Sequence, residues 1–361
     1  MEIQNTTCDR CERLPRQFAS AIDLYLSAPV AGTRDKILMA LHSADIDTTE
    51  RSGVLKATLE HVELDRVAAR LSKSLSASEQ HDTRALVVEA GSDPGLTDFI
   101  HMQSLESVIA RIDGEHIVGL LADGRLVTYL HPIVDAKNTD SVFAYECLTR
   151  GLDPNGSIVP PNVLFGIARR ADVLFYLDRE SRMTSLRSGA GVAPRSKLFV
   201  NFNPGTIYSP EYCLRSTMRT LDEVGLTPDD VVFEVVESDR VEDVDHLLRV
   251  LDYYRERGFE VALDDLGAGF NSLTSLSQLR PDYMKLDIDL VRDVDRDPFR
   301  EAIVRNLLAL ARDLKITTIA EGIEREGEYL WVRNAGADYL QGYYFARPEP
   351  ADQVIANLPI A

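Results

Sequence analysis

A series of short apolar runs, from residue 143 to the end of the chain, carries acidic, amide and lysine side chains. These side chains are Glu146, Asn201, Glu234, Asp264, Asp265, Lys285, Asp287, Glu321 and Gln341. Carboxylate and amide oxygens suit Mg2+ or Mn2+, whereas zinc prefers sulfur and nitrogen ligands. If folding brings these side chains together, the sequence predicts a site for hard divalent cations.

Two of the acids suggest what such a site could do. Asp264 and Asp265 are adjacent at the end of one run, so they could address two cations, with Asp264 bridging them. Two cations about 4 Å apart can clamp a phosphodiester and generate hydroxide for an in-line attack. The pattern therefore favours metal-dependent hydrolysis of a phosphodiester.

The elements that would position these residues are alternating strands and helices. The runs have a β-favouring composition, and amphipathic stretches separate most of them, which is typical of a parallel sheet. So many units predict a closed (β/α)8 barrel of the TIM type, in which the carboxyl ends of the strands meet at one mouth. Alternation along one strand would place Glu146, Leu148 and Arg150 on the same face.

The first strand of this barrel should run antiparallel to the second. Residues 127–134 and 142–148 flank the polar turn 135–141. That turn is too short for a parallel crossover, which needs a dozen or more residues. We therefore expect an α/β barrel with one antiparallel strand at its start.

The region before the barrel is predicted to be smaller and mostly helical. Leu55, Leu59 and Val62 repeat at helical spacing, and residues 1 to about 80 are interpreted as helices. Residues 85–90 could form a strand and residues 104–112 a helix. We expect residues 1–114 to be a regulatory or dimerising region and residues 115–361 to be the barrel. A helical packing module is favoured over a ligand-sensing domain.

Cys8 and Cys11 form a CxxC pair, which is half of a structural zinc site. His42, His61 or His81 could complete it, but the sequence has no second spaced pair. A reduced pair without metal is the favoured interpretation, and structural zinc at Cys8 and Cys11 is the alternative. The four cysteines make no disulfide framework for a chain of 361 residues.

The composition limits the classes of partner that this protein could bind. The formal charge of −19 argues against a nucleic acid polymer, because such binders depend on clustered Lys and Arg. No apolar run reaches the roughly 18 residues of a membrane span, and the polar N-terminus does not resemble a secretory signal. We therefore expect a cytoplasmic protein without a membrane partner.

Several spaced motifs carry a resemblance to a known family. They are Pro132 to Asp135, Glu146-Cys147-Leu148 with Arg150, Asn201 with Pro204, Glu234 with Glu237, Asp264 to Gly269, Lys285 with Asp287, Ala320 to Glu324, and Gln341-Gly342. In these motifs residues 115–361 resemble the EAL family of cyclic di-GMP phosphodiesterases. The resemblance implies hydrolysis of cyclic di-GMP to linear pGpG with Mg2+ or Mn2+, with two cations in each site.

The resemblance also implies roles for single residues. The implied metal ligands are Glu146, Asn201, Glu234 and Asp264 for the first cation, and Asp264, Asp265 and Glu321 for the second. Lys285 would position or polarise the attacking water, and Gln341 would support the water or the substrate. Glu321 is also a candidate general base, and the sequence leaves base and ligand open.

Substrate contacts and a loop complete the implied site. Leu148, Arg150, His131 and Asp287 are the implied substrate-binding residues, with Arg150 reaching a phosphate oxygen. Residues 265–275 resemble a mobile loop that Glu237 would anchor in the competent state. In the family this loop contributes to a dimer of barrels, so a homodimer is expected by analogy.

Two positions depart from the family pattern. Cys147 replaces the usual alanine, and His131 stands where glutamine is more frequent, so altered guanine contact or pH dependence could follow. Neither change removes a metal ligand. Two other functions remain open: a degenerate domain that binds cyclic di-GMP without cutting it, and an unrelated metal-dependent barrel enzyme such as an enolase-type lyase.

Overall fold

The computed structural model describes residue 14 and residues 18–193, 195–236, 244–267 and 272–358. Within these residues the chain divides into two compact units. One unit contains Leu126–Ile158 and Asp178–Ala361, and the other contains Asp9–Arg125 together with Val159–Leu177. The predictions for Cys8, Cys11 and Glu237 lie outside the described residues.

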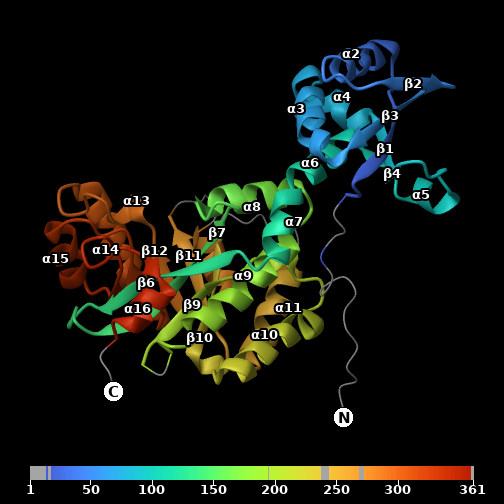
Figure 1. Cartoon of the computed structure of the whole chain (residues 1–361). Coiled ribbons are helices and arrows are strands. Elements are labelled where there is room, and N and C mark those ends of the chain that lie inside the picture. The colour runs from blue at the N-terminus through green and yellow to red at the C-terminus, as the bar shows by residue number, and fades with distance from the viewer. Residues whose placement is uncertain (1–13, 15–17, 194, 237–243, 268–271, 359–361) are drawn as a thin grey trace. The chain divides into compact units, whose positions relative to one another are not determined.

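The larger unit is a closed barrel of eight strands (Figure 1). Its strands are β6 (Leu126–Asp135), β7 (Val142–Leu152), β9 (Lys197–Asn201), β10 (Val231–Val236), β11 (Glu260–Leu266), β12 (Tyr283–Leu286), β13 (Thr317–Ala320) and β14 (Tyr339–Leu340). Seven of them run parallel, and β6 pairs antiparallel with both β7 and β14 to close the barrel. The predicted TIM-type barrel with an antiparallel first strand is therefore confirmed.

Helices and short strands lie between and after these barrel strands in the chain, and among them residues 159–177 belong to the smaller unit. They are β8 (Ile158–Val159), α8 (Pro161–Arg170), α9 (Leu174–Gly189), η2 (Pro204–Thr206), α10 (Pro210–Val224), η3 (Pro228–Asp230), α11 (Val244–Arg255), α12 (Ser272–Leu279), α13 (Ile288–Val291), α14 (Pro298–Leu314), α15 (Glu326–Ala335), β15 (Glu349–Pro350) and α16 (Ala351–Ala356). The connections that precede α10 and α14 place Pro210 and Pro298 at the first helical position, where the missing N–H costs no hydrogen bond.

One apolar layer fills the interior of the barrel. It is made of Ile133, Ala144, Phe199, Val232, Ala262, Tyr283 and Ile319, with Phe143 and Tyr339 packed against it. Successive strands contribute these side chains, so the barrel is a packed core rather than a pore. Phe143 stacks on Tyr339 with 3.7 Å between the ring centres, which helps to join β7 and β14 across the antiparallel strand.

The smaller unit is built on a five-stranded antiparallel sheet in the order β2-β3-β1-β4-β5. Its elements are β1 (Ala21–Ser27), α2 (Ala31–His42), β2 (Thr48–Arg51), β3 (Val54–Glu60), η1 (His61–Glu63), α3 (Leu64–Ser74), α4 (Ala77–Asp82), β4 (Arg84–Glu89), α5 (Leu96–Ile100), β5 (Gln103–Ser104), α6 (Leu105–Asp113) and α7 (Glu115–Ala122). The strand predicted at residues 85–90 and the helix at 104–112 are confirmed as β4 and α6.

The helical interpretation of residues 1 to about 80 was wrong in three places, at β1, β2 and β3. Leu55 and Leu59 are four residues apart, which fits one face of a helix and also one face of a strand. In β3, Leu55, Ala57 and Leu59 are all buried, so the real period is two. Helices still hold more residues than strands here, but an antiparallel sheet organises the unit.

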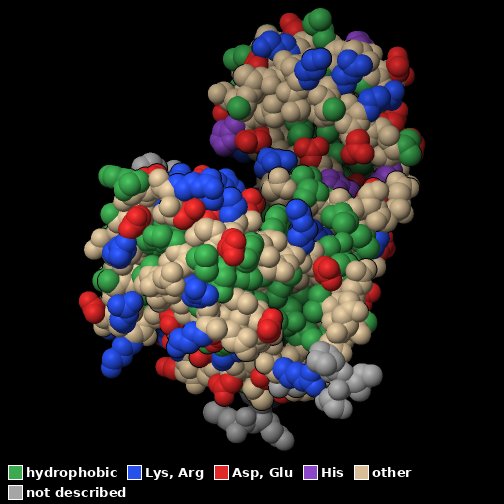
Figure 2. All heavy atoms as spheres, turned by 90° about the vertical axis from the view of Figure 1, so that its left-hand side faces the viewer, with side chains coloured by type: hydrophobic (Ala, Val, Ile, Leu, Met, Phe, Trp, Pro, Cys, Tyr) green, Lys and Arg blue, Asp and Glu red, His purple; other side chains and the backbone are tan. Residues whose placement is uncertain are grey.

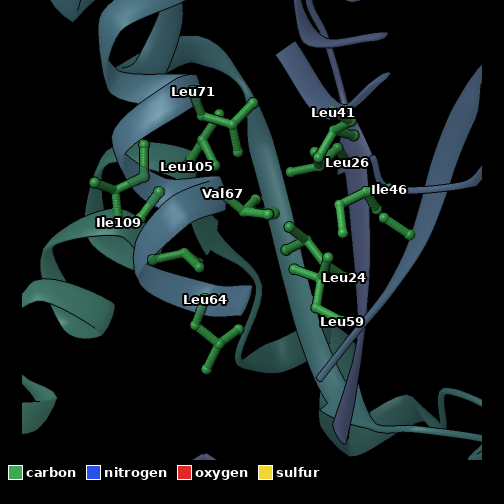
Figure 3. Packing of buried hydrophobic residues seen from close by; sticks show 14 of the residues in the cluster. Leu24, Leu26, Leu41, Ile46, Leu59, Leu64, Val67, Leu71, Leu105 and Ile109 are labelled. Atoms are coloured by element: carbon green, nitrogen blue, oxygen red, sulfur yellow. The ribbon is translucent and has the colours of Figure 1, made fainter. Parts of the chain in front are cut away.

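Helices cover one face of this sheet. Figure 3 shows Val67 and Leu71 of α3 on the side of the helix that faces β1 and β3, and Leu64 belongs to the same buried cluster as Leu24 and Leu59. Leu105 and Ile109 of α6 belong to the same buried cluster, and so does Leu41 of α2. The sheet therefore has its own hydrophobic core, as an independently packed unit requires.

No helix among the described residues is both long enough and apolar enough to cross a membrane. The face drawn in Figure 2 carries Lys and Arg side chains interspersed with Asp and Glu side chains.

Gly342, just after β14, offers a test of the barrel's closing segment. A Cβ atom there would lie 2.2 Å from the Ile323 carbonyl oxygen and 2.3 Å from its nitrogen, at a φ of +155°. We expect Gly342→Ala to lower the free energy of unfolding by about 3 kcal/mol or more, because backbone must move. Gly225→Ala is the matched control, since it has a φ of +74° and no atom within 4 Å of the added Cβ.

The control should cost only about 1 kcal/mol, the penalty of a left-handed backbone without a collision. Urea denaturation followed by near-ultraviolet circular dichroism measures both variants. Equal losses for Gly225→Ala and Gly342→Ala would contradict the close packing of Gly342 on Ile323.

Candidate active site

A polar layer lies directly above the apolar layer of the barrel. Side chains two residues apart on a strand share a face, so the next inward position on each parallel strand comes two residues after the apolar one. These positions are Glu146, Asn201, Glu234, Asp264, Lys285, Glu321 and Gln341. On β6, which runs the other way, the matching position comes two residues before Ile133 and is His131. All eight strands thus place one of the predicted site residues in a single layer.

Lys285 lies at the centre of this layer. Its ammonium nitrogen Nζ is 2.6 Å from Glu234 Oε1, 2.6 Å from Glu321 Oε1 and 2.9 Å from Asp264 Oδ1. Glu146 Oε1 is 3.6 Å away. The lysine side chain is only 1% exposed. Four carboxylates from four different strands therefore surround one buried positive charge.

Lys285 and burial shift the pKa values of the acids in opposite directions: the ammonium lowers them, and burial raises them. Burial raises the pKa of Glu234 well above its ordinary value, and the neighbouring Glu146 and Asp264 add to the rise against the opposing effect of Lys285. Burial likewise raises the pKa of Glu321. Burial would also raise the pKa of Glu146, but Lys285 and the neighbouring His131 and Gln341 lower it to about 2. Despite burial, the surrounding carboxylates raise the pKa of Lys285. One ammonium cannot neutralise all of these carboxylates.

His131 and Gln341 hold the other side of Glu146. The amide nitrogen of Gln341 donates to Glu146 Oε2 at 2.8 Å and lies 2.9 Å from His131 Nδ1. An amide nitrogen only donates, so His131 Nδ1 accepts, and His131 Nε2 carries the proton that faces the Ala346 carbonyl at 3.2 Å. This chain of contacts fixes the orientation of the Gln341 amide. Asn201 Nδ2 similarly donates to Glu234 Oε2 at 3.2 Å.

A second group of acids adjoins the layer. Asp264, Asp265 and Glu321 each offer an oxygen within 4.8 Å of the others. Burial, followed by the charge of Asp264, raises the pKa of Asp265 to about 6, and Asp287 contributes to that rise. Asp265 has a left-handed backbone with a φ of +55°, a conformation that aspartate tolerates better than most residues. Asp287 also caps α13, since its Oδ1 accepts from the Asp289 amide at 2.7 Å.

The residues of the polar layer fit divalent cations. Every donor in the layer that could bind a metal is a carboxylate or amide oxygen, apart from His131, and hard cations prefer such oxygens. Glu234 Oε1 and Glu321 Oε1 are buried, and they meet Lys285 in ion pairs but have no hydrogen bond of suitable geometry. Each of these oxygens has the Lys285 ammonium as its ion-pair partner and keeps a lone pair with which to bind a cation.

Two predicted substrate residues lie farther along β7 than Glu146. Leu148 pairs with Tyr129, and Arg150 pairs with Val127, while the parallel neighbour β9 pairs only with residues 144–147 of β7. The guanidinium of Arg150 lies 5.6 Å from the centre of the Tyr129 ring and donates to the Thr149 carbonyl at 2.8 Å. Cys147 is buried on the opposite face, as expected.

The anchor residue and part of the loop lie outside the residues that the structure describes. Glu237, predicted to hold the loop after Asp265, lies outside the described residues, and so do residues 268–271. The described structure therefore brings together all the predicted site residues except Glu237, with Leu148 and Arg150 at the margin of the layer.

Sequence reasoning missed a buried ion pair that supports Asn201. Asp178 Oδ2 lies 2.8 Å from the Arg182 guanidinium, and Asp178 Oδ1 accepts from the Asn203 backbone at 3.0 Å. The Thr206 hydroxyl donates to the same Asp178 carboxylate at 3.1 Å. The pair thereby holds the segment just after Asn201. Its only sequence signal is an aspartate and an arginine four residues apart on a predicted helix.

Known proteins are similar to this chain in sequence and in fold. A model of the EAL domain family matches residues 115–348. An uncharacterized signaling protein of Caulobacter vibrioides is 30% identical over 233 residues, which make up 64% of this chain and 28% of that protein. The probable cyclic di-GMP phosphodiesterase PdeG of Escherichia coli is 27% identical over 230 residues, or 63% of this chain and 45% of PdeG.

A solved structure agrees with these relatives. A standalone EAL protein from Vibrio cholerae O395, in its c-di-GMP bound form, is 34% identical with a TM-score of 0.56, and the match covers 62% of this chain and 92% of that one. The chain spans less than half the length of the two curated relatives. The family match covers well over half of the chain and contains the whole polar layer, so the chain belongs to the EAL domain family.

Proposed function

We propose that this chain is a phosphodiesterase that hydrolyses cyclic di-GMP to linear pGpG with two bound divalent cations, Mg2+ or Mn2+. The observation that carries the proposal is the complete polar layer, in which Glu146, Glu234, Asp264 and Glu321 surround Lys285. Two similar proteins support the substrate, because one is named a probable cyclic di-GMP phosphodiesterase and another was solved with c-di-GMP.

The proposed cation ligands are those that the family resemblance implies. Glu146, Asn201, Glu234 and Asp264 would hold the first cation, and Asp264, Asp265 and Glu321 the second. The second set has three oxygens within 4.8 Å of one another. Bound cations would supply charge to neutralise the phosphodiester and would lower the pKa of a bound water.

The chain's own residues would orient the reacting water and its proton. The Lys285 ammonium is a charged donor among carboxylates, so it can hold a water oxygen in a fixed direction. Gln341 is held by His131 and Glu146, and it therefore presents its amide in one orientation. Glu321 lies against Lys285 and beside Asp264 and Asp265, and it remains a candidate for both base and ligand.

Substrate contacts lie along the first two strands and β12. Arg150 would donate two hydrogen bonds to a phosphate oxygen pair, which a planar guanidinium does well. Leu148 would pack against a guanine ring, and His131 and Asp287 would bound the same pocket. Glu237 would anchor the loop 265–275 when substrate is bound.

The proposed function extends to the roles of the two regions, the oligomeric state and the cellular location. We propose residues 115–361 as the phosphodiesterase domain and residues 1–114 as a regulatory or dimerising region. We also propose a homodimer, by analogy with the family, and a cytoplasmic location, as expected from the sequence composition. A receptor that binds cyclic di-GMP without hydrolysis is the main alternative, and the assay below separates the two.

The first prediction tests turnover. Purified chain with Mg2+ or Mn2+ should convert cyclic di-GMP to pGpG, as followed by HPLC. Glu146→Gln should lower the rate by at least about a hundredfold, because it removes a charged ligand while keeping the shape of the side chain. Asp140→Asn, an exposed change in the turn before β7, is the matched control and should leave the rate unchanged.

Nucleotide binding without pGpG in either metal would support the receptor instead. Isothermal titration with cyclic di-GMP provides that measurement.

The second prediction concerns the metal. EDTA should abolish turnover, and Mg2+ or Mn2+ should restore it. Ca2+ should compete with these ions without supporting the reaction, because it shares their charge but takes more ligands at longer distances. Equal rates in Ca2+ and Mg2+ would count against the two-cation scheme.

The third prediction tests the counter-charge provided by Lys285. In EDTA, Lys285→Met should lower the free energy of unfolding by about 3 to 5 kcal/mol, because it leaves buried carboxylates without a positive partner. Lys197→Met is the matched control: Lys197 pairs with Glu260 at 2.6 Å, but its side chain is 26% exposed. That change should cost less than about 1 kcal/mol. Urea denaturation measures both, and similar losses would show that Lys285 is not the central counter-charge.

A further inference from the structure

Glu328 is a buried carboxylate outside the polar layer. It lies in the first turn of α15 and is 2% exposed. Its Oε2 accepts from the backbone N–H groups of Glu324, at 3.1 Å, and Arg325, at 3.0 Å. Its Oε1 accepts from the backbone N–H of Asp293 at 2.9 Å and from the Arg325 guanidinium at 2.8 Å. Both oxygens therefore have two donors.

Ordinary helix capping explains only one of these bonds. A glutamate at the third position of a helix often accepts from the N–H of the capping residue, which here is Arg325. The bonds from Glu324 and Asp293 reach beyond the helix, to two different connections of the barrel. One connection follows β13 and begins with Glu321, and the other follows β12, the strand of Lys285, and begins with Asp287.

The Arg325 guanidinium strengthens the same link. It lies 2.9 Å from Asp293 Oδ1 and 2.8 Å from Asp295 Oδ1, as well as 2.8 Å from Glu328. Although burial works against it, the hydrogen bonds from the Asp293 and Glu324 backbone and from Arg325 keep the pKa of Glu328 below its ordinary value. The three carboxylates could hold a cation by their spacing, but the guanidinium already bridges them.

A second contact joins the two connections closer to the site. Gly322, next to Glu321, lies so close to Ile288 that a Cβ atom would be 2.2 Å from Ile288 Cγ1. The Ile323 backbone N–H donates to the Gln341 carbonyl at 3.1 Å. The segment that carries Glu321 is thus fixed at Gly322 and Ile323 and, through Glu328, at Glu324 and Arg325.

We propose that Glu328 is a positioning residue that locks the connection carrying Glu321 onto the connection carrying Asp287, and thereby sets how tightly the site holds its second cation. The inference rests on the proposed function for the identity of the cations. Groups that orient metal ligands without touching the metal commonly change metal affinity by 10- to 100-fold when they are replaced.

Glu328→Gln is the variant that tests this role. The amide offers a single oxygen, and its NH2 group would face N–H donors, so one of the two connections loses its acceptor. We expect the Mn2+ concentration for half-saturation to rise about tenfold. Glu326→Gln is the matched control, because Glu326 is an exposed glutamate in the same helical turn. It should stay within about twofold of the unchanged chain.

The measurement is the loss of the free Mn2+ signal in electron paramagnetic resonance, with the full chain and no nucleotide. This readout needs no turnover. A residue that only stabilised the fold would lower the melting temperature in EDTA without changing the Mn2+ affinity of the folded protein. Full Mn2+ affinity in folded Glu328→Gln would overturn the inference, and so would an unchanged chain that binds no Mn2+.

A second variant covers the case in which Glu328→Gln does not fold. Arg325→Lys removes the planar fork but keeps a cation among Asp293, Asp295 and Glu328, so these acids gain no new Mn2+ site. We expect about a threefold weaker Mn2+ affinity, and no change would overturn the inference. If the variants weaken Mn2+ binding but the unchanged chain makes no pGpG, the proposed function fails and the positioning role stands.

Discussion

Repulsion among buried carboxylates is the interaction on which the rest of this structure depends. Glu146, Glu234, Asp264 and Glu321 converge on Lys285, and Asp265 adjoins them. Such an arrangement opposes folding, because one ammonium cannot offset so many desolvated negative charges. It persists because packing and strand hydrogen bonds in the rest of the barrel stabilise the fold enough to offset this cost, as is common at functional sites. The proposed function depends on the same unbalanced charge, which would attract divalent cations to the mouth.

The barrel enforces this convergence through strand geometry. Beneath the polar layer, an apolar residue on each strand packs into the interior, and the two-residue repeat of a strand carries the next inward side chain to the mouth. A strand backbone cannot swing its side chain away without losing its hydrogen bonds on both sides. Further contacts fix the segments that follow the strands. Asp178, paired with Arg182, fixes the segment after Asn201, and Glu328 fixes the segment after Glu321. The positions of the acids are therefore fixed by the packed apolar layer beneath them and by the buried charged groups Asp178, Arg182 and Glu328.

Much of this was predictable because the chemistry is local to strand ends. Polar residues that interrupt short apolar runs indicated the strands, and the short turn before β7 indicated the antiparallel start. The contacts across the barrel were not predictable in the same way. His131 meets Gln341 only because β6 and β14 pair, and nothing near either residue specifies the other. The role of Glu328 was hidden for another reason, since its distant partner Asp293 contributes a backbone N–H that carries no sequence signal. In the smaller unit, Leu55 and Leu59 suited a helix and a strand equally well.

The antiparallel strand has a consequence for how the molecule is made. The barrel closes where Tyr339 and Leu340 pair with Asp135 and Val134, residues more than half the chain apart. Pairings of such long range form late, because their loop entropy must be overcome before any contact is gained. During synthesis, the strands from β6 to β13 emerge before β14, and β6 is already paired with β7, so the open edges of this sheet are those of β6 and β13. The eighth barrel strand, β14, is therefore the one that closes this sheet into a cylinder and joins Gln341 to acids that lie much earlier in the chain.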